Sequence, residues 1–166
     1  MYIIVNKKGP FFFFFLTINI NPTAEELFDI TLLTANAVKK FGIVPRIALL
    51  SYSNFGSSDG EESKKVRKAV AILYEKYLDF ALNTELIGEQ FPFSELGKTS
   101  ANTLIFPTLS SGNIAYKLMQ EMGGAEAIGP VLLGLSKSMH IWRLGSSVRE
   151  IINMITLSVV DAQTKK

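Results

Sequence analysis

The chain has 166 residues, enough for one domain that buries roughly 70% of the surface of its unfolded chain. Its 17 basic and 15 acidic residues nearly balance, which argues against a nucleic-acid-binding surface or a polyanionic one. The chain has no cysteine, so disulfides, thiolate metal sites and cysteine nucleophiles are excluded. Because His140 is the only histidine, we expect it to be structural and expect no metal site.

An apolar block, FFFFFL, occupies residues 11–16. It is shorter than the roughly 7–15 residues of a signal-peptide core, lacks a small-residue cleavage site, and is far below the roughly 20 residues of a membrane span. We therefore expect a cytoplasmic protein with no membrane partner. Aromatic and β-branched residues over 11–20 predict a strand, introduced by a Gly9-Pro10 turn and placed away from any exposed sheet edge.

A long helix is predicted to follow, ending at Phe41 with Gly42 as its stop signal. Thr23 is a suitable N-cap, and Glu26 three residues later completes a capping box. The residues expected to face the sheet are Leu27, Ile30, Leu32 and Leu33.

A second buried strand is predicted over 46–53, followed by a loop of small polar residues and a helix over 61–77. Lysines 64, 65 and 68 of that helix read as a solvated face. The loop lies where ligands bind in α/β proteins, at the carboxyl end of a strand, although a plain serine-rich connector is the alternative. Its candidate ligand residues are Ser51, Ser53, Asn54, Gly56, Ser57 and Ser58. Residues 78–97 are mixed, with an ambiguous helix over 84–90.

A third buried strand is predicted over 103–106, ended by Pro107. Residues 108–112 supply hydroxyl groups and glycine where a helix begins, and apolar residues at helical spacing follow from Asn113. A helix N-terminus at the end of a strand suits a phosphate or carboxylate. The alternative is that Ser110 or Ser111 simply caps the helix. Two polar loops at the ends of strands in one sheet can converge on one crevice.

The remaining sequence predicts a strand over 127–135, a short strand over 139–142, and a final helix capped by Ser146 or Ser147. Alternating strands and helices indicate an α/β fold with a largely parallel sheet. Neither a G-x-x-x-x-G-K-[ST] loop nor a G-x-G-x-x-G fingerprint occurs, so nucleotide binding by either route is unsupported. The apolar face of the final helix is formed by Val148, Ile151, Ile152, Ile155 and Val159.

Three segments resemble the phosphate acetyl/butyryltransferase (phosphotransacetylase) family: TININPTAEEL at 17–27, PRIALLSYSNFGSS at 45–58 and SGNIAYKLMQEMGGAEAIGPVLLGL at 111–135. The resemblance covers most of residues 9–163. The ending, HIWRLGSSVREIINMITLSVVDAQ at 140–163, is most similar to the carboxyl-terminal domain of hybrid, NADP-dependent malic enzymes.

This resemblance implies a three-layer α/β sandwich of the isocitrate/isopropylmalate dehydrogenase-like superfamily, truncated at its N-terminus. The whole chain, 1–166, would be one phosphotransacetylase-like domain. Residues 9–142 would form its α/β core, and the helical segment 143–166 would belong to a second lobe.

Active members of the family move an acetyl group between coenzyme A (CoA) and phosphate. That reaction needs a base, donors for the phosphate and oxyanion, and an aligned thiol. The family pattern places a serine-arginine pair before a glycine, which is Gly145 here, so Arg143 and Leu144 stand in the place of that pair. Glu150 matches the carboxylate and is the candidate base, with Arg143 as a degenerate partner. By resemblance, the residues expected to bind phosphate or CoA are the loop residues 51, 53, 54 and 56–58, with Ser111, Gly112, Asn113, Ser146 and Ser147.

Two further departures from the family pattern remove parts of it. Phe14, Phe15 and Leu16 stand where the first strand ordinarily carries an aspartate, and the segment after Tyr77 is about ten residues too short for the usual extra strand. We therefore expect an acetyl-CoA-binding or CoA-binding regulatory and oligomerising domain without transferase turnover, with no tightly bound cofactor. An active transferase using phosphate or acetyl phosphate is the alternative, and a purely structural module is the third interpretation. A homodimer or higher homo-oligomer is expected, within a parent oxaloacetate-decarboxylating malic enzyme.

Overall fold

The computed structural model describes residues 1–7, 9–15, 20–53, 57–76, 101–137, 139–142 and 144–164, together with the backbone of residues 85–87. These residues form a six-stranded sheet with the order β4-β3-β5-β2-β1-β6. Its strands are β1 (Tyr2–Asn6), β2 (Gly9–Phe14), β3 (Arg46–Leu49), β4 (Glu85–Ile87), β5 (Thr103–Ile105) and β6 (Glu126–Ile128). The helices are α1 (Ala24–Lys39), α2 (Glu61–Lys76), α4 (Leu109–Glu121) and α5 (Val148–Thr164).

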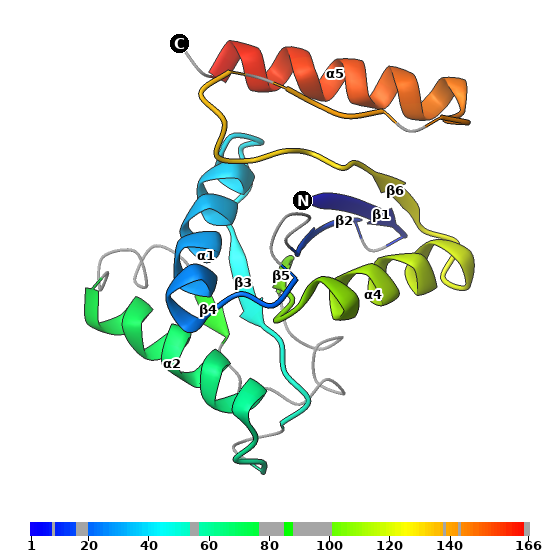
Figure 1. Cartoon of the computed structure of the whole chain (residues 1–166). Helices are drawn as coiled ribbons and strands as arrows, with labels where there is room; N and C mark the ends of the chain where they lie inside the picture. Colours follow the sequence, from blue (N-terminus) through cyan, green and yellow to red (C-terminus); the bar gives the residue numbers. More distant parts are fainter. Residues whose placement is uncertain are drawn as a thin grey trace.

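Helices cover both faces of the sheet, which confirms the predicted layered α/β fold (Figure 1). On one face α1 and α2 enclose a buried cluster that includes Phe12, Leu27 and Ile47. On the other face α4 covers the sheet, and its Tyr116 stacks on Tyr2 with ring centroids 4.5 Å apart. The carboxyl-terminal helix α5 lies apart from these layers, beside β6 and the end of α1.

The sheet is mixed, because its amino-terminal strand runs against its neighbours. β2 pairs with β5, β5 with β3 and β3 with β4, all in parallel, whereas β1 is antiparallel to both β2 and β6. No local pattern in the sequence predicted β1. A tight reversal makes this pairing possible, since Gly9 adopts a φ of 112°, a region that residues with a side chain rarely enter.

The phenylalanine run occupies a central strand, as predicted, because β2 lies between β1 and β5. Successive side chains of a strand point to opposite faces, so the run serves two cores at once. Phe12 and Phe14 belong to the cluster beneath α1 and α2, and Phe13 and Phe15 belong to the cluster beneath α4. All four are at most 6% exposed, and each such burial contributes about 1.5–3 kcal/mol.

Helix α1 begins with the predicted capping box. The Glu26 amide donates to Thr23 Oγ1 at 3.2 Å, and the Thr23 amide donates to the Glu26 carboxylate at 2.7 Å. Leu27 and Ile30 are buried as expected, but Leu33 is 44% exposed, so its predicted burial is wrong. Thr31 takes a buried position instead, because its hydroxyl donates to the Leu27 carbonyl at 2.7 Å and is thereby satisfied.

Several predicted element bounds differ from the structure. β3 ends at Leu49 rather than at residue 53, and residues 85–87 form a strand beside β3 where a helix was considered. β6 ends at Ile128, immediately before Gly129-Pro130, whose proline has no N–H group for a strand ladder. The predicted strand over 139–142 is reduced to one antiparallel bridge between Val131 and His140. β2 ends at Phe14, residues 16–19 of the predicted strand over 11–20 lie outside the described part of the chain, and Ile20 is exposed and not in a strand.

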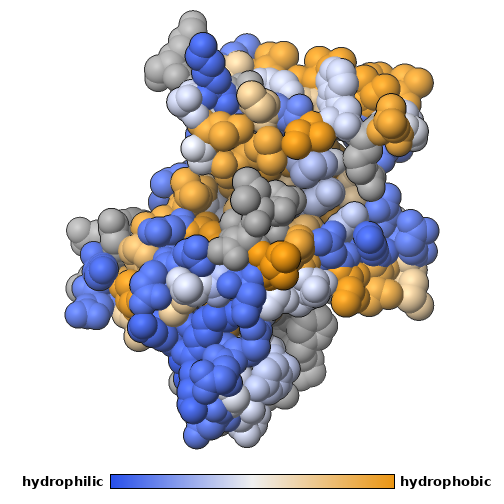
Figure 2. Space-filling view, in the orientation of Figure 1, coloured by the Kyte–Doolittle hydropathy of each residue, from blue (hydrophilic) through white to orange (hydrophobic). Residues whose placement is uncertain are grey.

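The final helix, α5, carries its apolar residues on the outside. Met154 packs inward and is 4% exposed. Four residues of the predicted apolar face are 47–74% exposed: Val148, Ile152, Ile155 and Val159. Figure 2 shows hydrophobic side chains gathered over this end of the molecule, whereas hydrophilic ones dominate around α2. None of the helices in the described ranges is long and apolar enough to span a membrane.

Candidate functional site

The carboxyl ends of three parallel strands meet at one edge of the sheet. Beyond the end of β3, the Leu50 amide donates to the Ile105 carbonyl at 2.9 Å, and the Phe106 amide donates to the Phe14 carbonyl at 3.0 Å. The polar loop that begins at Ser51 and the turn that begins at Pro107 therefore leave from neighbouring strands. The structure brings these two predicted loops to one edge, which we call the carboxyl edge.

Hydroxyl groups of the first loop fold the loop itself. The Ser53 amide donates to Ser51 Oγ at 3.0 Å, and the Ser58 amide donates to Ser53 Oγ at 3.3 Å. Ser53 is only 2% exposed, so its hydroxyl group stabilises the conformation of the loop from a buried position. The Gly60 amide donates to Ser58 Oγ at 3.4 Å, just before α2 begins. Asn54 and Gly56 lie outside the described residues, and ligand contacts of Ser51, Ser57 and Ser58 stay predictions.

The second loop forms the N-terminus of α4, one turn earlier than the sequence indicates. Thr108 is the N-cap, because its Oγ1 accepts from the Ser111 amide at 3.2 Å. Ser111 Oγ in turn accepts from the Thr108 amide at 3.3 Å, so Ser111 belongs to the capping box without being the cap. The Asn113 side-chain amide donates to the Leu109 carbonyl at 3.2 Å. These bonds assign local structural roles to Ser111 and Asn113, and their contact with a ligand stays a prediction.

Gly112 is required by close packing between α4 and β2. A Cβ atom at this position would lie 2.3 Å from the ring of Phe15, far inside van der Waals contact. The glycine thus lets the first turn of α4 approach the end of the phenylalanine strand. Its predicted role in ligand binding is untested, but its packing role is sufficient reason for a glycine here.

A lysine that the sequence analysis placed on a solvated face belongs to the carboxyl edge. The side chain of Lys65 is 14% exposed, so that prediction is wrong for this residue. Its ammonium group donates to Asn21 Oδ1 at 2.7 Å, to the Pro107 carbonyl at 3.1 Å and to Glu62 at 2.8 Å. Lys65 therefore ties α2 to the turns that precede α1 and α4. Helical spacing alone gave no signal of this role, because its acceptors are distant in sequence.

The other predicted site residues lie at the start of α5. The Glu150 amide donates to Ser147 Oγ at 3.2 Å, and the Ser147 amide donates to the Glu150 carboxylate at 2.6 Å. This capping box confirms Ser147 as the N-cap and assigns the candidate base a structural role. Arg149 forms an ion pair with Glu126 of β6 at 2.9 Å, which holds the helix start against the sheet. Arg143 lies outside the described residues.

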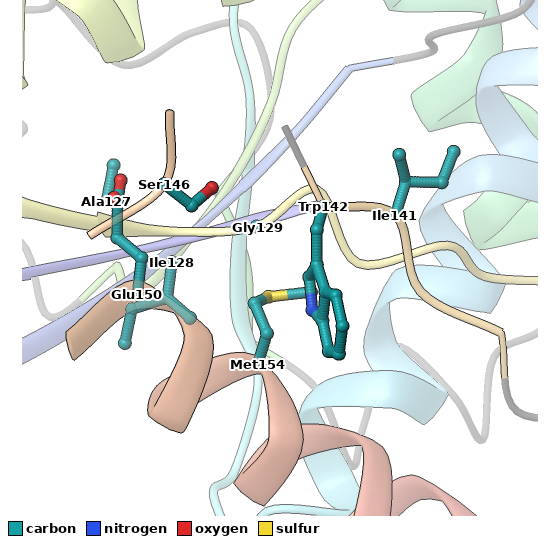
Figure 3. A pocket seen from close by; sticks show the side chains of 8 residues that line it. All are labelled: Ala127, Ile128, Gly129, Ile141, Trp142, Ser146, Glu150 and Met154. Atoms are coloured by element: carbon teal, nitrogen blue, oxygen red, sulfur yellow. The ribbon is translucent and has the colours of Figure 1, made fainter. Parts of the chain in front are cut away.

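A small cavity lies between β6 and the start of α5 (Figure 3). Its volume is about 10 Å³, which is room for no more than about one water molecule. Its lining residues are Ala127, Ile128, Gly129, Ile141, Trp142, Ser146, Glu150 and Met154. This space is too small for a pantetheine arm or a phosphate.

The predicted site residues therefore form two separate groups. β3 carries the first loop, whereas Ser146 and Glu150 lie beside β6, and β5, β2 and β1 intervene in the sheet order. Four strand steps at a spacing of about 4.8 Å separate β3 from β6 by about 19 Å. Within the ranges described, no group of three histidine, aspartate or glutamate side chains is placed to hold a metal ion.

Comparison with known proteins identifies the family. The family model for phosphate acetyl/butaryl transferase matches residues 1–159. An NADP-dependent malic enzyme of Haemophilus influenzae is 45% identical over 156 residues, which are 88% of this chain and 20% of that protein. A phosphate acetyltransferase of Clostridium acetobutylicum is 38% identical over 95% of this chain and 50% of its own length.

Solved structures agree with this assignment. The EutD phosphotransacetylase from Staphylococcus aureus superposes with a TM-score of 0.85 at 28% identity, covering 97% of this chain and 53% of that one. A phosphotransacetylase from Streptococcus pyogenes gives a TM-score of 0.82 at 34% identity, covering 98% of this chain and 53% of that one. The chain belongs to the phosphate acetyl/butyryltransferase family, and it spans about half of these transferases and a fifth of the malic enzyme.

Proposed function

We propose that this chain is a regulatory and oligomerising phosphotransacetylase-like domain of a malic enzyme, which binds acetyl-CoA or CoA without transferase turnover. Two observations support the proposal. The carboxyl edge brings together the loop that begins at Ser51 and the N-terminus of α4, whose first turn is positioned by Lys65 through the Pro107 carbonyl. The transfer group is altered, because Arg143 and Leu144 stand in place of the family's serine and arginine.

The position of Glu150 in the capping box of α5 is the observation that argues most strongly against transferase turnover. Its carboxylate accepts a bond from the Ser147 amide at 2.6 Å, beside a cavity of about 10 Å³. A general base must reach the proton that it removes within hydrogen-bonding distance. Glu150 lies beside β6, which is three strand steps, or about 14 Å, from β5, so a carboxylate held in this cap is poorly placed to act on a ligand at the carboxyl edge.

A thermal-shift titration with acetyl-CoA tests binding. A ligand present at one hundred times its Kd stabilises the fold by about 2.7 kcal/mol. We expect the melting temperature to rise for the wild type and for Lys117→Ala, a control on the body of α4, and to rise less for Ser57→Ala. A flat titration up to millimolar acetyl-CoA contradicts the proposal.

Active phosphate acetyl transfer is a second candidate, favoured by the 38% identity to a phosphate acetyltransferase. Incubation with acetyl phosphate and CoA, followed by measurement of the thioester, distinguishes the two. Thioester formation well above the background rate establishes a transferase. We expect none, because the loss of one oxyanion donor alone reduces turnover by about 10²–10³.

The exposed face of α5 supports a third function in assembly. A stripe of four apolar side chains, 47–74% exposed, favours burial against another protein surface. We propose that residues 143–166 belong to a second lobe of the family fold, and that the assembled protein is a cytoplasmic homodimer or higher homo-oligomer. Size-exclusion chromatography with light scattering tests assembly, and a clean monomer at all concentrations contradicts it.

A further inference from the structure

A larger cavity lies at the opposite end of α1 from the carboxyl edge. The turn that precedes α1 is held at the carboxyl edge through Asn21, whereas the cavity reaches Lys40 beyond the other end of the helix. At 1.5 Å per residue the two ends are about 25 Å apart. The cavity measures about 380 Å³, within the range of about 300–1,000 Å³ that is typical of small-molecule sites.

One wall of this cavity is apolar and the other is polar. Leu33 and Ala37 from α1 face the chain segment 132–135, which contributes three leucines. Asn36 and Lys40 from α1, with Asp161 from α5, form the polar side. Such a cavity suits a small molecule that has an apolar body and a polar head.

The charges on the polar wall are paired and partly buried. Lys40 Nζ lies 3.3 Å from Asp161 Oδ1, and the side chains are 35% and 18% exposed. His140 Nε2 lies 3.6 Å from Asp161 Oδ2 and its side chain is 3% exposed, so it closes the cluster from the protein side. A ligand with a net charge would leave one unmatched charge in this half-buried place, which costs free energy.

A zwitterion matches this wall without leaving an unmatched charge. An ammonium group has three donors, and the bond to Asp161 takes one of those on Lys40. A carboxylate has about four acceptor positions, so Asp161 has capacity for more than one donor. A ligand carboxylate beside Lys40 and a ligand ammonium beside Asp161 would complete a four-charge arrangement of alternating sign.

We propose that this cavity binds an apolar α-amino acid of about the size of leucine. Its carboxylate contacts Lys40 and Asn36, its ammonium group contacts Asp161, and its side chain packs among Leu33 and the leucines of segment 132–135. The site is separate from the carboxyl edge, and the proposal holds whether or not that edge binds acetyl-CoA. Because the lining residues come from α1 and α5, the bound amino acid strengthens the attachment of α5 to the core.

Isothermal titration of the wild-type chain with three matched compounds tests the head group. The compounds are L-leucine, 4-methylpentanoic acid, which lacks the amino group, and 3-methylbutylamine, which lacks the carboxylate. A ligand of this size predicts a Kd on the order of 1 mM for leucine, and each analogue should bind at least about tenfold more weakly. No saturable leucine binding up to about 20 mM, or equal binding of all three compounds, overturns the proposal.

Two variants and a control locate the site. Asp161→Asn should weaken leucine about tenfold and strengthen the binding of 4-methylpentanoic acid, because Lys40 then lacks its paired carboxylate. Asn36→Phe fills the cavity from an exposed helix position and should abolish leucine binding without unfolding the chain. Lys68→Met, on α2, should bind leucine as the wild type does. Undiminished binding to a folded Asn36→Phe protein overturns the proposal even if Asp161→Asn fails to fold.

Discussion

The parallel and antiparallel sides of the sheet differ in how fully their apolar residues are buried. The parallel side, β4-β3-β5-β2, has its core beneath α1 and α2, and its central residues Ile47 and Ile105 are at most 1% exposed. The antiparallel side, β1 and β6 with α5, leaves an apolar stripe on α5 exposed. Parallel strands align their carboxyl ends, so this side supplies both a core and the edge at which we propose that acetyl-CoA binds. The exposed stripe of the other side is the surface that we propose for assembly.

The largest effect should appear in the core of the parallel side. Phe12→Ala removes a ring that is 1% exposed in the central strand and should lower the free energy of unfolding by about 4 kcal/mol. Phe11→Ala, at a partly buried position of the same strand, is the matched control and should cost less than half as much. Urea unfolding followed by circular dichroism measures both. Equal losses would contradict the account of β2 as the shared centre of two cores.

The free energy of unfolding should depend on pH because of a buried amino group next to β1, on the antiparallel side. In the 166-residue chain, burial lowers the pKa of the Met1 amino group from 8.0 to about 5, and this group donates to the Val131 carbonyl at 2.9 Å. The unfolded chain therefore binds the proton more readily than the folded chain. Stability is full above pH 8 and falls as the pH drops toward 5, by up to about 4 kcal/mol.

Urea unfolding at intervals between pH 5 and pH 8 measures this loss. Acetylation of the amino group removes its charge and should flatten this contribution to the pH profile. A profile that is the same with and without acetylation would show that the amino group of Met1 is not buried as described.

Replacing Lys65 should destabilise the carboxyl edge. Lys65→Met leaves Asn21, Glu62 and the Pro107 carbonyl without their shared donor, and should cost about 2 kcal/mol of unfolding free energy. It should also reduce the stabilisation by acetyl-CoA. Lys68→Met, whose partner Glu25 is exposed, is the control and should change stability by less than about 0.5 kcal/mol. Identical effects of the two variants would contradict the role of Lys65 in stabilising the carboxyl edge.

The smallest expected effect concerns the start of α5. Ser147→Ala removes the N-cap and should cost about 1 kcal/mol. Because the capping box lies against β6, this variant should leave acetyl-CoA binding within twofold of the wild type, whereas Thr108→Ala, the equivalent cap of α4, should weaken it. Thermal unfolding with and without acetyl-CoA compares them. If Ser147→Ala lost more acetyl-CoA binding than Thr108→Ala, the start of α5 would belong to the same binding site as the carboxyl edge, which would contradict their separation.

Local signals predicted the fold well where the sequence is locally consistent. The capping box at Thr23 and Glu26, the buried strands around Ile47 and Leu104, and the helices α1 and α2 all follow from nearby residues. The antiparallel β1 was missed, because its partners, β2 and β6, are chosen by tertiary pairing. The short β6 was overestimated for a similar reason, since the apolar residues after Pro130 read as a continued strand.

The site was harder to predict than the fold. The convergence of the two polar loops followed from strand order, and the structure brings them together. The separation of Glu150 from those loops depends on where α5 lies, which no local pattern records. Lys65 was missed for the same reason, because its acceptors Asn21 and Pro107 are 44 and 42 residues away in the chain.

Hydrogen exchange with and without acetyl-CoA reports on both groups of predicted site residues in one experiment. Bound acetyl-CoA should slow exchange in peptides covering residues 50–58 and 106–113, at the carboxyl edge, and leave exchange in residues 144–150 unchanged. Protection confined to residues 144–150, or the same protection in both regions, would contradict this prediction.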